Sequence, residues 1–410
     1  MSNNKYVKIT VYLLLYLISV IVAMTLRNNY YHLGLGNPLY LEIDKMTRGF
    51  QFKQIFASII LFMAGYCIAA VMLPFLSELS KIILSMPLGI AVWGLASVTL
   101  LILRIPYTRI TSFAGAAIWI AVLLFRHRKG FSSVKGRFLL RALAIAAILA
   151  NLFSTGYPRY TVTSDTHYCV YMYGRLVAAT GKLSADVVGD MMETTGIMPA
   201  LMSSFAVFCG FETVQVIHYI LMTSLMAGMA VYLYKVCLGM FLPKWKRIGL
   251  VALLLLTAAA PLFLMYDLII SHSWIMVYMF FTATMAKEYA WVKDRAVGGG
   301  VISLLSLFFS WLSLCRVEAI VTVVFMAVCI SYLGYSRREI AICVIPSMVL
   351  ACVFHLENQI MILGNKDLPY GSVFITKSVL LLMAAAVVLM AAYILLYEKA
   401  WVKRLHRYLR

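Results

Sequence analysis

The chain has 410 residues, of which 63% are hydrophobic and 12% are charged, and its mean hydropathy is +0.91. Soluble domains are roughly half apolar and a quarter charged, so this composition excludes an ordinary soluble protein and indicates an integral membrane protein. The formal net charge is +19 at pH 7. A basic cytoplasmic face that attracts anionic lipid headgroups accounts for such a charge, so it does not call for a nucleic-acid partner.

Apolar stretches that could each cross a membrane recur along the whole chain. They predict an all-α integral membrane fold with about 12 transmembrane helices, each long enough for a hydrocarbon core of about 30 Å. The first stretch is too long for the core of a signal peptide, so we expect it to be retained. The expected spans are 7–26, 54–76, 82–103, 110–125, 138–154, 215–234, 248–265, 273–290, 299–315, 319–335, 339–356 and 374–397.

The distribution of charge predicts the orientation. With both termini in the cytoplasm, most of the 35 lysines and arginines fall on the cytoplasmic side, the densest group lying at 126–141. Most of the 16 acidic residues fall on the external side. Any chemistry performed by carboxylates is therefore expected at the external face of the cell membrane.

The longest external loop, 155–214, is too long to lack structure of its own. A helix is expected from Asp165 to just before Gly181, because Thr163 or Ser164 can cap its start and glycine favours its end. Its apolar side chains recur at helical spacing and form a face that could lie on the membrane surface: Tyr168, Met172, Leu176 and Ala179. A second short helix is expected at 184–194, and the apolar segment 200–211 is too short to span, so we expect it to lie in the interface or dip in and out.

The order of residue types in this loop resembles the first external loop of the GT-C superfamily of glycosyltransferases. An acidic residue follows a span, an aromatic residue and arginine come next in "YMYGR", and a glycine follows in "LVAATGKL". A proline then precedes an apolar segment in "MPALMSSFAVF", followed by "CGFE" and the next span. The resemblance covers residues 150–235, and the remainder of the chain agrees with it in span count and topology.

The resemblance implies a multi-pass enzyme that takes a sugar from a polyprenyl-phosphate carrier at the outer face. It implies that Asp165 is the catalytic base or a ligand for a divalent cation. Many members carry two adjacent acids where this chain has Ser164 and Asp165, so Glu193 is a candidate to complete the site. The implied organisation is an N-terminal four-helix membrane module at 1–137, a GT-C-like core at 138–397 that contains the external loop, and a basic cytoplasmic tail at 398–410.

Each loop residue also has a simpler interpretation. Asp165 could only cap its helix or be a solvated acid. His167 points about 200° away from Asp165 on a helix, so spacing implies no shared metal site. It either contacts sugar or phosphate or is an ordinary interfacial histidine. Arg175 either pairs with an acid or phosphate or extends its side chain to the lipid headgroups.

Two further stretches interrupt apolar sequence near the external ends of spans. In "LCRVEAI", Arg316 and Glu318 are ionisable residues at membrane depth, which favours a functional role, and the planar guanidinium suits a carrier phosphate. The alternative is a tight polar turn. In "YDLIISHSW", the resemblance implies that Asp267 and His272 border the substrate cavity.

The leading hypothesis is a glycosyltransferase that moves a sugar from a polyprenyl-phosphate donor to a glycan, lipid or protein acceptor. Membrane lipids and a divalent cation are further expected ligands. The alternative is a multi-pass transporter or flippase of lipid-linked saccharide, which would place ionisable groups near the bilayer midplane. A polymerase or ligase of lipid-linked glycans and a non-enzymatic assembly subunit also fit the sequence.

Overall fold

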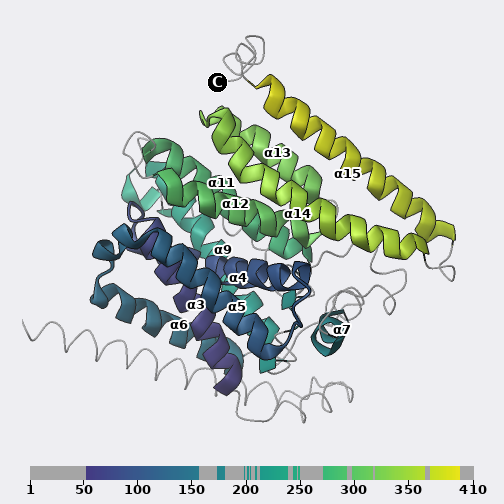
Figure 1. Cartoon of the computed structure of the whole chain (residues 1–410). Coiled ribbons are helices and arrows are strands. Elements are labelled where there is room, and N and C mark those ends of the chain that lie inside the picture. Colours follow the sequence, from purple (N-terminus) through teal and green to yellow (C-terminus); the bar gives the residue numbers. More distant parts are fainter. Residues whose placement is uncertain are drawn as a thin grey trace, which may run out of the picture. The chain divides into compact units, whose positions relative to one another are not determined.

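The structure is a computed structural model that describes residues 52–156, 173–180, 213–238, 243–246, 248–249, 271–292, 298–316, 319–364 and 370–397, with single positions at 198, 201–202, 204 and 208–209. The described residues contain no β-strand, which confirms the predicted all-α class for that part of the chain (Figure 1). The elements are α3 (Phe52–Met72), α4 (Glu78–Ile102), α5 (Arg109–Arg126), the 3₁₀ helix η1 (Arg128–Ser133), α6 (Gly136–Gly156), α7 (Tyr173–Thr180), α9 (Thr213–Leu238), α11 (Ser271–Val292), α12 (Gly298–Cys315), α13 (Ala319–Tyr332), α14 (Arg337–Gly364) and α15 (Tyr370–Leu396).

The predicted spans that fall among the described residues are helical. Seven of the described helices are long and apolar enough to cross a membrane, and the apolar stretches of α12 and α13 are shorter. The predicted span 7–26 lies outside the described residues, as does the predicted span 248–265 except for its first two residues, so the total of about 12 spans stays a prediction. The chain is therefore a helical membrane protein with several spanning helices.

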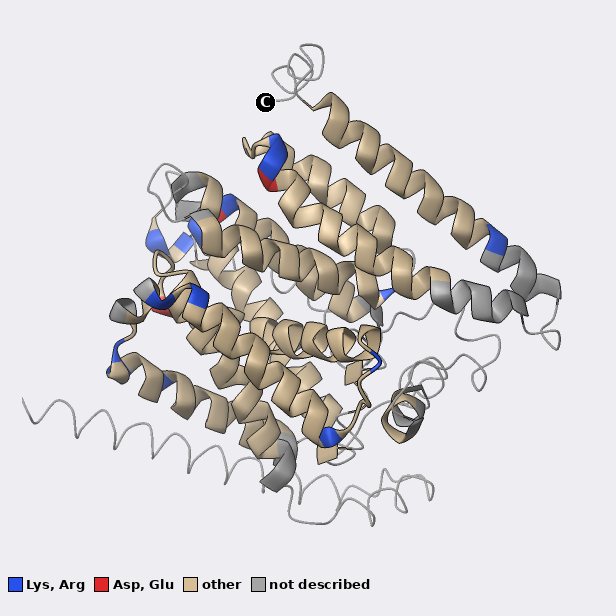
Figure 2. Ribbon diagram, viewed as in Figure 1, with Lys and Arg blue, Asp and Glu red and all other residues tan. Residues whose placement is uncertain are grey.

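Charged residues lie mostly near the helix ends in the described part of the chain, and the middles of the helices carry almost none (Figure 2). This distribution is what a hydrocarbon core requires, because a charge at the bilayer centre costs several kcal/mol. It agrees with the sequence pattern from which the spans were predicted.

The chain forms two compact units. Unit 1 contains α3, α4 up to Ile90, α5 from Ile120, η1, α6 and α9. Unit 2 contains the remaining parts of α4 and α5 together with α7 and α11–α15. The modules predicted from the resemblance, with a boundary at residue 137, remain a prediction.

Small residues bring the helices of unit 1 close together. A Cβ atom on Gly65 of α3 would lie 1.8 Å from the backbone oxygen of Ser85, and one on Gly89 of α4 would lie 1.9 Å from that of Leu61. Glycine is therefore required on both sides of this contact, as is common where membrane helices approach closely. Gly130 of η1 approaches the backbone oxygen of Val71 in the same way, so η1 lies against the end of α3.

Candidate functional site

The predicted site residues fall into two groups. The side chain of Arg316 is described, and Arg175 and His272 lie in the helices α7 and α11, of which the backbone is described at these two positions. The other four lie outside the described residues: Asp165, His167, Glu193 and Glu318. The structure thus leaves the proposed catalytic carboxylates as predictions.

Helix α7 matches the second half of the helix expected in the external loop. It ends at Thr180, the residue before Gly181, as the sequence predicted. Its described side chains are buried at Gly174 and Val177, whereas Ala179, which was expected on the apolar face, is exposed. The apolar face was expected to lie on the membrane surface, with which the exposed Ala179 is compatible, and the side chains of its other three residues are not described, so this face stays a prediction.

Arg316 lies in the short turn that joins α12 to α13. Helix α12 ends at Cys315, and the turn closes when the backbone N–H of Ala319 donates to the oxygen of Arg316 at 3.2 Å. The Arg316 side chain is half-buried. This bond is compatible with the tight turn that was one interpretation of the stretch, and Arg316 directly follows the end of the apolar helix α12, whereas residues 317 and 318 lie outside the described residues.

A buried polar cluster lies between the last turn of α12 and the middle of α14, and we call Ser313, Ser347 and His355 the α12–α14 cluster. The hydroxyl of Ser313 donates to the backbone oxygen of Ser347 at 3.1 Å. The Nε2 of His355 lies 2.9 Å from the backbone oxygen of Ser313. A carbonyl oxygen only accepts, so Nε2 carries the proton. All three side chains are buried, and His355 is 1% exposed.

His355 has a clear structural role in this arrangement. The last four carbonyl groups of a helix lack partners within the helix, and that of Ser313 is among them in α12. By donating to this oxygen, His355 fixes the end of α12 only three residues before Arg316. The α12–α14 cluster therefore supports the turn that carries the arginine.

The opposite end of unit 2 is held by a different set of polar contacts. The hydroxyl of Tyr289 near the end of α11 donates to Oε1 of Glu339 at 3.2 Å, and the backbone N–H of Ser336 donates to Oε2 at 2.7 Å. The hydroxyl of Tyr335 donates to the backbone oxygen of Ala286 at 2.9 Å. Burial, and then the nearby Cys343, Tyr289 and Glu339 as charged groups, raise the pKa of Tyr335, so its hydroxyl stays a neutral donor.

These contacts show which helix ends of unit 2 lie together. The end of α11 and the start of α14 lie together, at the end predicted to be cytoplasmic. The end of α12 and the second half of α14 lie together at the other end, which is predicted to be external. Arg316 and His355 therefore belong to the same end of unit 2, away from Glu339.

The apolar segment after Pro199 is held by protein at its described positions. Leu201, Met202 and Ser204 are buried, and the hydroxyls of Ser204 and Tyr107 lie 2.8 Å apart. Tyr107 is itself fully buried in the connection between α4 and α5. The described positions of this segment are helical, and the expectation that it lies in the interface or dips in and out stays a prediction.

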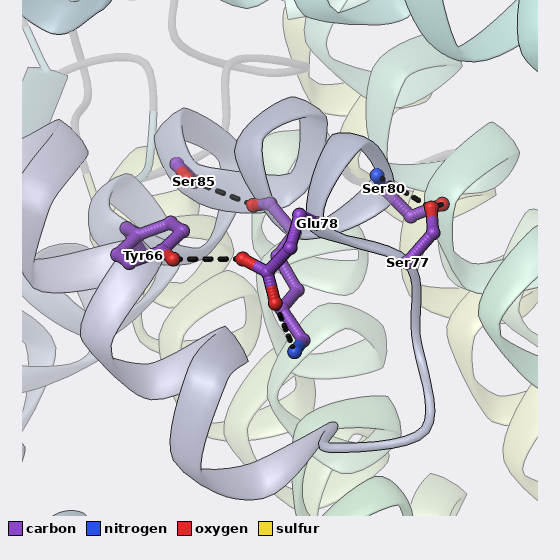
Figure 3. Close-up of polar contacts among 6 residues, drawn as sticks. Tyr66, Ser77, Glu78, Ser80 and Ser85 are labelled. Atoms are coloured by element: carbon purple, nitrogen blue, oxygen red, sulfur yellow. Dashed lines mark hydrogen bonds and ion pairs between the residues drawn. The ribbon is translucent and has the colours of Figure 1, made fainter. Parts of the chain in front are cut away.

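A second polar contact set joins α3 to α4 in unit 1 (Figure 3). The hydroxyl of Tyr66 donates to Oε2 of Glu78 at 2.9 Å, and Nζ of Lys81 donates to Oε1 of the same carboxylate at 2.8 Å. Ser77 caps the start of α4 by accepting from the N–H of Ser80 at 3.2 Å. Each charged group here has a partner within the fold, so helix attachment explains the set without any reaction.

Some polar residues inside the predicted spans are buried, and the sequence led to no prediction about them. His218 of α9 is fully buried, Asn151 of α6 is 5% exposed, and both lie near the helix ends predicted to be external. His355 belongs to the same kind. A polar residue inside an apolar stretch was the signal that could have identified all three, because such residues are costly in a membrane and favour function.

The part of the chain that the structure describes contains no group of three or more histidine, cysteine or acidic residues arranged to hold a metal ion. The predicted cation ligand Asp165 lies outside that part.

Fold and contacts define a class of protein: a helical membrane protein with an arginine-bearing turn supported by a buried histidine. Comparisons with protein-family models, with curated proteins and with solved structures give no match for this chain. The particular function therefore has to be proposed from the residues themselves.

Proposed function

We propose that the chain is a membrane glycosyltransferase that moves a sugar from a polyprenyl-phosphate donor to a glycan, lipid or protein acceptor at the external face. The observation that carries the proposal is Arg316, a half-buried arginine between the end of the apolar helix α12 and the start of the apolar helix α13. The α12–α14 cluster next to this turn supports a fixed position for the arginine. The predicted sorting of acidic residues to the external side supports the same face.

Sugar transfer from a lipid phosphate needs a base and a holder for the leaving phosphate. In the proposed reaction Asp165 takes the proton of the acceptor hydroxyl while its oxygen attacks the anomeric carbon of the sugar. The bond from that carbon to the phosphate oxygen breaks, and the polyprenyl phosphate leaves with the electron pair. Arg316 binds this phosphate through its planar guanidinium, and Arg175 is a second candidate for the same charge.

Glu193, Glu318, His272 and His167 are assigned supporting roles. Glu193 takes the place of the second acid that the family pattern would put beside Asp165. The others are candidates to contact the sugar or the phosphate. A divalent cation held by Asp165 would polarise the phosphate oxygens and lower the barrier to departure.

The test is transfer from polyprenyl-phosphate glucose and polyprenyl-phosphate mannose, each labelled in the sugar, by purified protein in proteoliposomes. Asp165→Asn should lower kcat by about 100-fold or more, as expected for loss of a general base. Arg316→Ala should raise KM for the donor. Arg316→Lys should raise it less, because lysine keeps the positive charge but lacks the planar guanidinium. Lys377→Ala is the control, since Lys377 is an exposed cation near the start of α15.

Two results would reject this function. One is transfer by Asp165→Asn at the wild-type rate. The other is a cysteine at position 165 that reacts with an impermeant thiol reagent only from the cytoplasmic side. Equal losses in Arg316→Ala and Lys377→Ala would reject the specific role of Arg316.

The buried polar residues of unit 1 favour a second function, a transporter or flippase of lipid-linked saccharide. His218 and Asn151 lie inside spanning helices, where polar groups often line a substrate path. A flippase would move a fluorescent lipid-linked saccharide across proteoliposomes without releasing labelled product. Transfer without such movement would favour the glycosyltransferase.

A further inference from the structure

A groove of about 520 Å³ runs between α14 and α15 in unit 2. Only apolar side chains and one cysteine line it: Ile345, Met348, Val349, Cys352, Val353, Val387, Met390, Ala391, Ile394 and Leu395. Several of these side chains stay exposed, including Val349 at 55% and Leu395 at 63%. The groove is therefore an apolar surface depression between two helices that are long and apolar enough to span a membrane.

The groove residues of α14 belong to one exposed stripe of that helix. Ile345, Val349 and Val353 are exposed and follow one another at helical spacing. The same stripe continues toward the start of α14 through Ile342 to Arg338, both exposed. Arg338 comes seven residues before Ile345, which places the two within about 20° of each other around the helix.

The two arginines at the start of α14 lack a partner among the described residues. No described side chain forms a hydrogen bond or ion pair with Arg337 or Arg338. The nearby carboxylate of Glu339 receives its hydrogen bonds from Tyr289 and Ser336 instead. The positive end of the helix dipole further disfavours two cations in the first turn. A bound anion would neutralise this unfavourable positive charge.

The dimensions suit a lipid of a single leaflet. With a rise of about 1.5 Å per residue, the groove begins roughly 10 Å from Arg338 and ends roughly 22 Å from it. A leaflet contributes about half of the hydrocarbon thickness of about 30 Å, or roughly 15 Å. The acyl chain of a lipid whose headgroup lies level with Arg338 therefore reaches the nearer part of the groove, around Ile345 and Met348.

We propose that Arg337 and Arg338 bind the phosphate of an anionic phospholipid whose acyl chain lies in the α14–α15 groove. The lipid comes from the leaflet at the start of α14, which topology predicts to be cytoplasmic. The charge of the two arginines selects an anionic headgroup, and the apolar lining selects a hydrocarbon chain. Arg337 and Arg338 lie at the start of α14, away from His355, and the proposed lipid binding does not depend on glycosyl transfer.

Native mass spectrometry of the full chain, titrated with phosphatidylglycerol and with phosphatidylcholine, tests the proposal. The apparent dissociation constant of the first bound lipid should be lower for phosphatidylglycerol. Arg338→Gln should weaken its binding by about fivefold, and the double change with Arg337→Gln by about 25-fold, since each basic residue near a membrane surface contributes comparably. Ala391→Trp should also weaken it, because the indole would fill the groove.

Two matched variants separate this site from general lipid binding. Arg109→Gln removes an exposed arginine from the first turn of α5, at the other predicted side of the membrane, and should leave the first binding constant unchanged. Leu381→Trp adds an indole at a position of α15 that is 73% exposed and outside the groove. It should also leave binding unchanged.

Three outcomes would overturn the proposal. The first is equal affinity for the two lipids. The second is an equal loss in Arg338→Gln and Arg109→Gln. The third is unchanged binding in Ala391→Trp, which would show that another segment of this chain or a second copy occupies the groove.

Discussion

Two faces of helix α14 differ in the side chains that they carry and in how closely these side chains pack. Toward α12 it carries small and polar residues such as Cys343, Ser347 and His355, all of which are buried. Toward α15 it carries Ile345, Val349 and Val353, which are large, apolar and exposed, and a groove separates the helices there. The polar side chains in the middle of α14 are thus packed, together with apolar ones such as Val344 and Phe354, whereas large apolar side chains stay exposed, unlike the usual arrangement in a soluble protein.

The membrane explains this reversal. Lipid is as apolar as leucine, so burying a leucine between two membrane helices gains little, and close packing with hydrogen bonds holds the helices instead. Serine and cysteine let α12 and α14 approach, and their polar atoms find partners: Cys343 Sγ lies 3.9 Å from the backbone oxygen of Ile302. The face toward α15 lacks such contacts among its described residues and leaves space.

The largest effect is expected from His355→Ala on the packed face. This change removes the hydrogen bond to Ser313 and leaves a void between α12 and α14, so the free energy of unfolding should fall by about 3 kcal/mol. Leu356→Ala, which truncates the exposed neighbour, should cost less than about 1 kcal/mol. Unfolding by sodium dodecyl sulfate in mixed micelles measures both values. Similar losses in the two variants would show that the faces do not differ in this way.

Much of α14 could be predicted from the sequence because a run of apolar residues marks a span directly. The expected span 339–356 lies within the observed helix, which starts at Arg337 and continues to Gly364. The start is explained by Ser336 and Glu339, a capping pair that satisfies the first backbone groups. The candidate membrane span of this helix, Arg337–Leu356, ends at the predicted residue, and the helix itself continues beyond it to Gly364 because the polar residues after Leu356 can remain helical.

The site could be predicted only in part. Arg316 was identified because a charge in an apolar run is rare and costly. His355 was missed because its importance depends on facing Ser313, and a helix with apolar residues on all sides carries no periodic signal that shows which neighbour a side chain faces. Asp165 and Glu193 stay predictions from the loop pattern.

A medium effect is expected from placing a leucine on each face of α14. Ser347→Leu forces extra carbon atoms into a closely packed contact and should lower the free energy of unfolding by about 2 kcal/mol. Val349→Leu adds one carbon on the groove side, where Val349 is 55% exposed, and should change it by less than about 0.5 kcal/mol. The same unfolding measurement compares them. If Val349→Leu costs as much as Ser347→Leu, the groove side is packed as tightly as the α12 side.

The smallest effect is expected from Ala391→Leu, which adds bulk to the groove from the α15 side. Ala391 is exposed and lines a space of about 520 Å³, so the larger side chain finds room and new contacts without displacing its neighbours. The free energy of unfolding should stay within about 0.5 kcal/mol of the wild type, whereas Ala351→Leu on the buried side of α14 should lower it by about 2 kcal/mol. In protein stripped of lipid, the added leucine should stabilise slightly, because it replaces part of the missing acyl chain. A loss of more than about 1 kcal/mol for Ala391→Leu would mean that protein already fills the groove, and the difference between the two faces of α14 would then lie in composition rather than in packing.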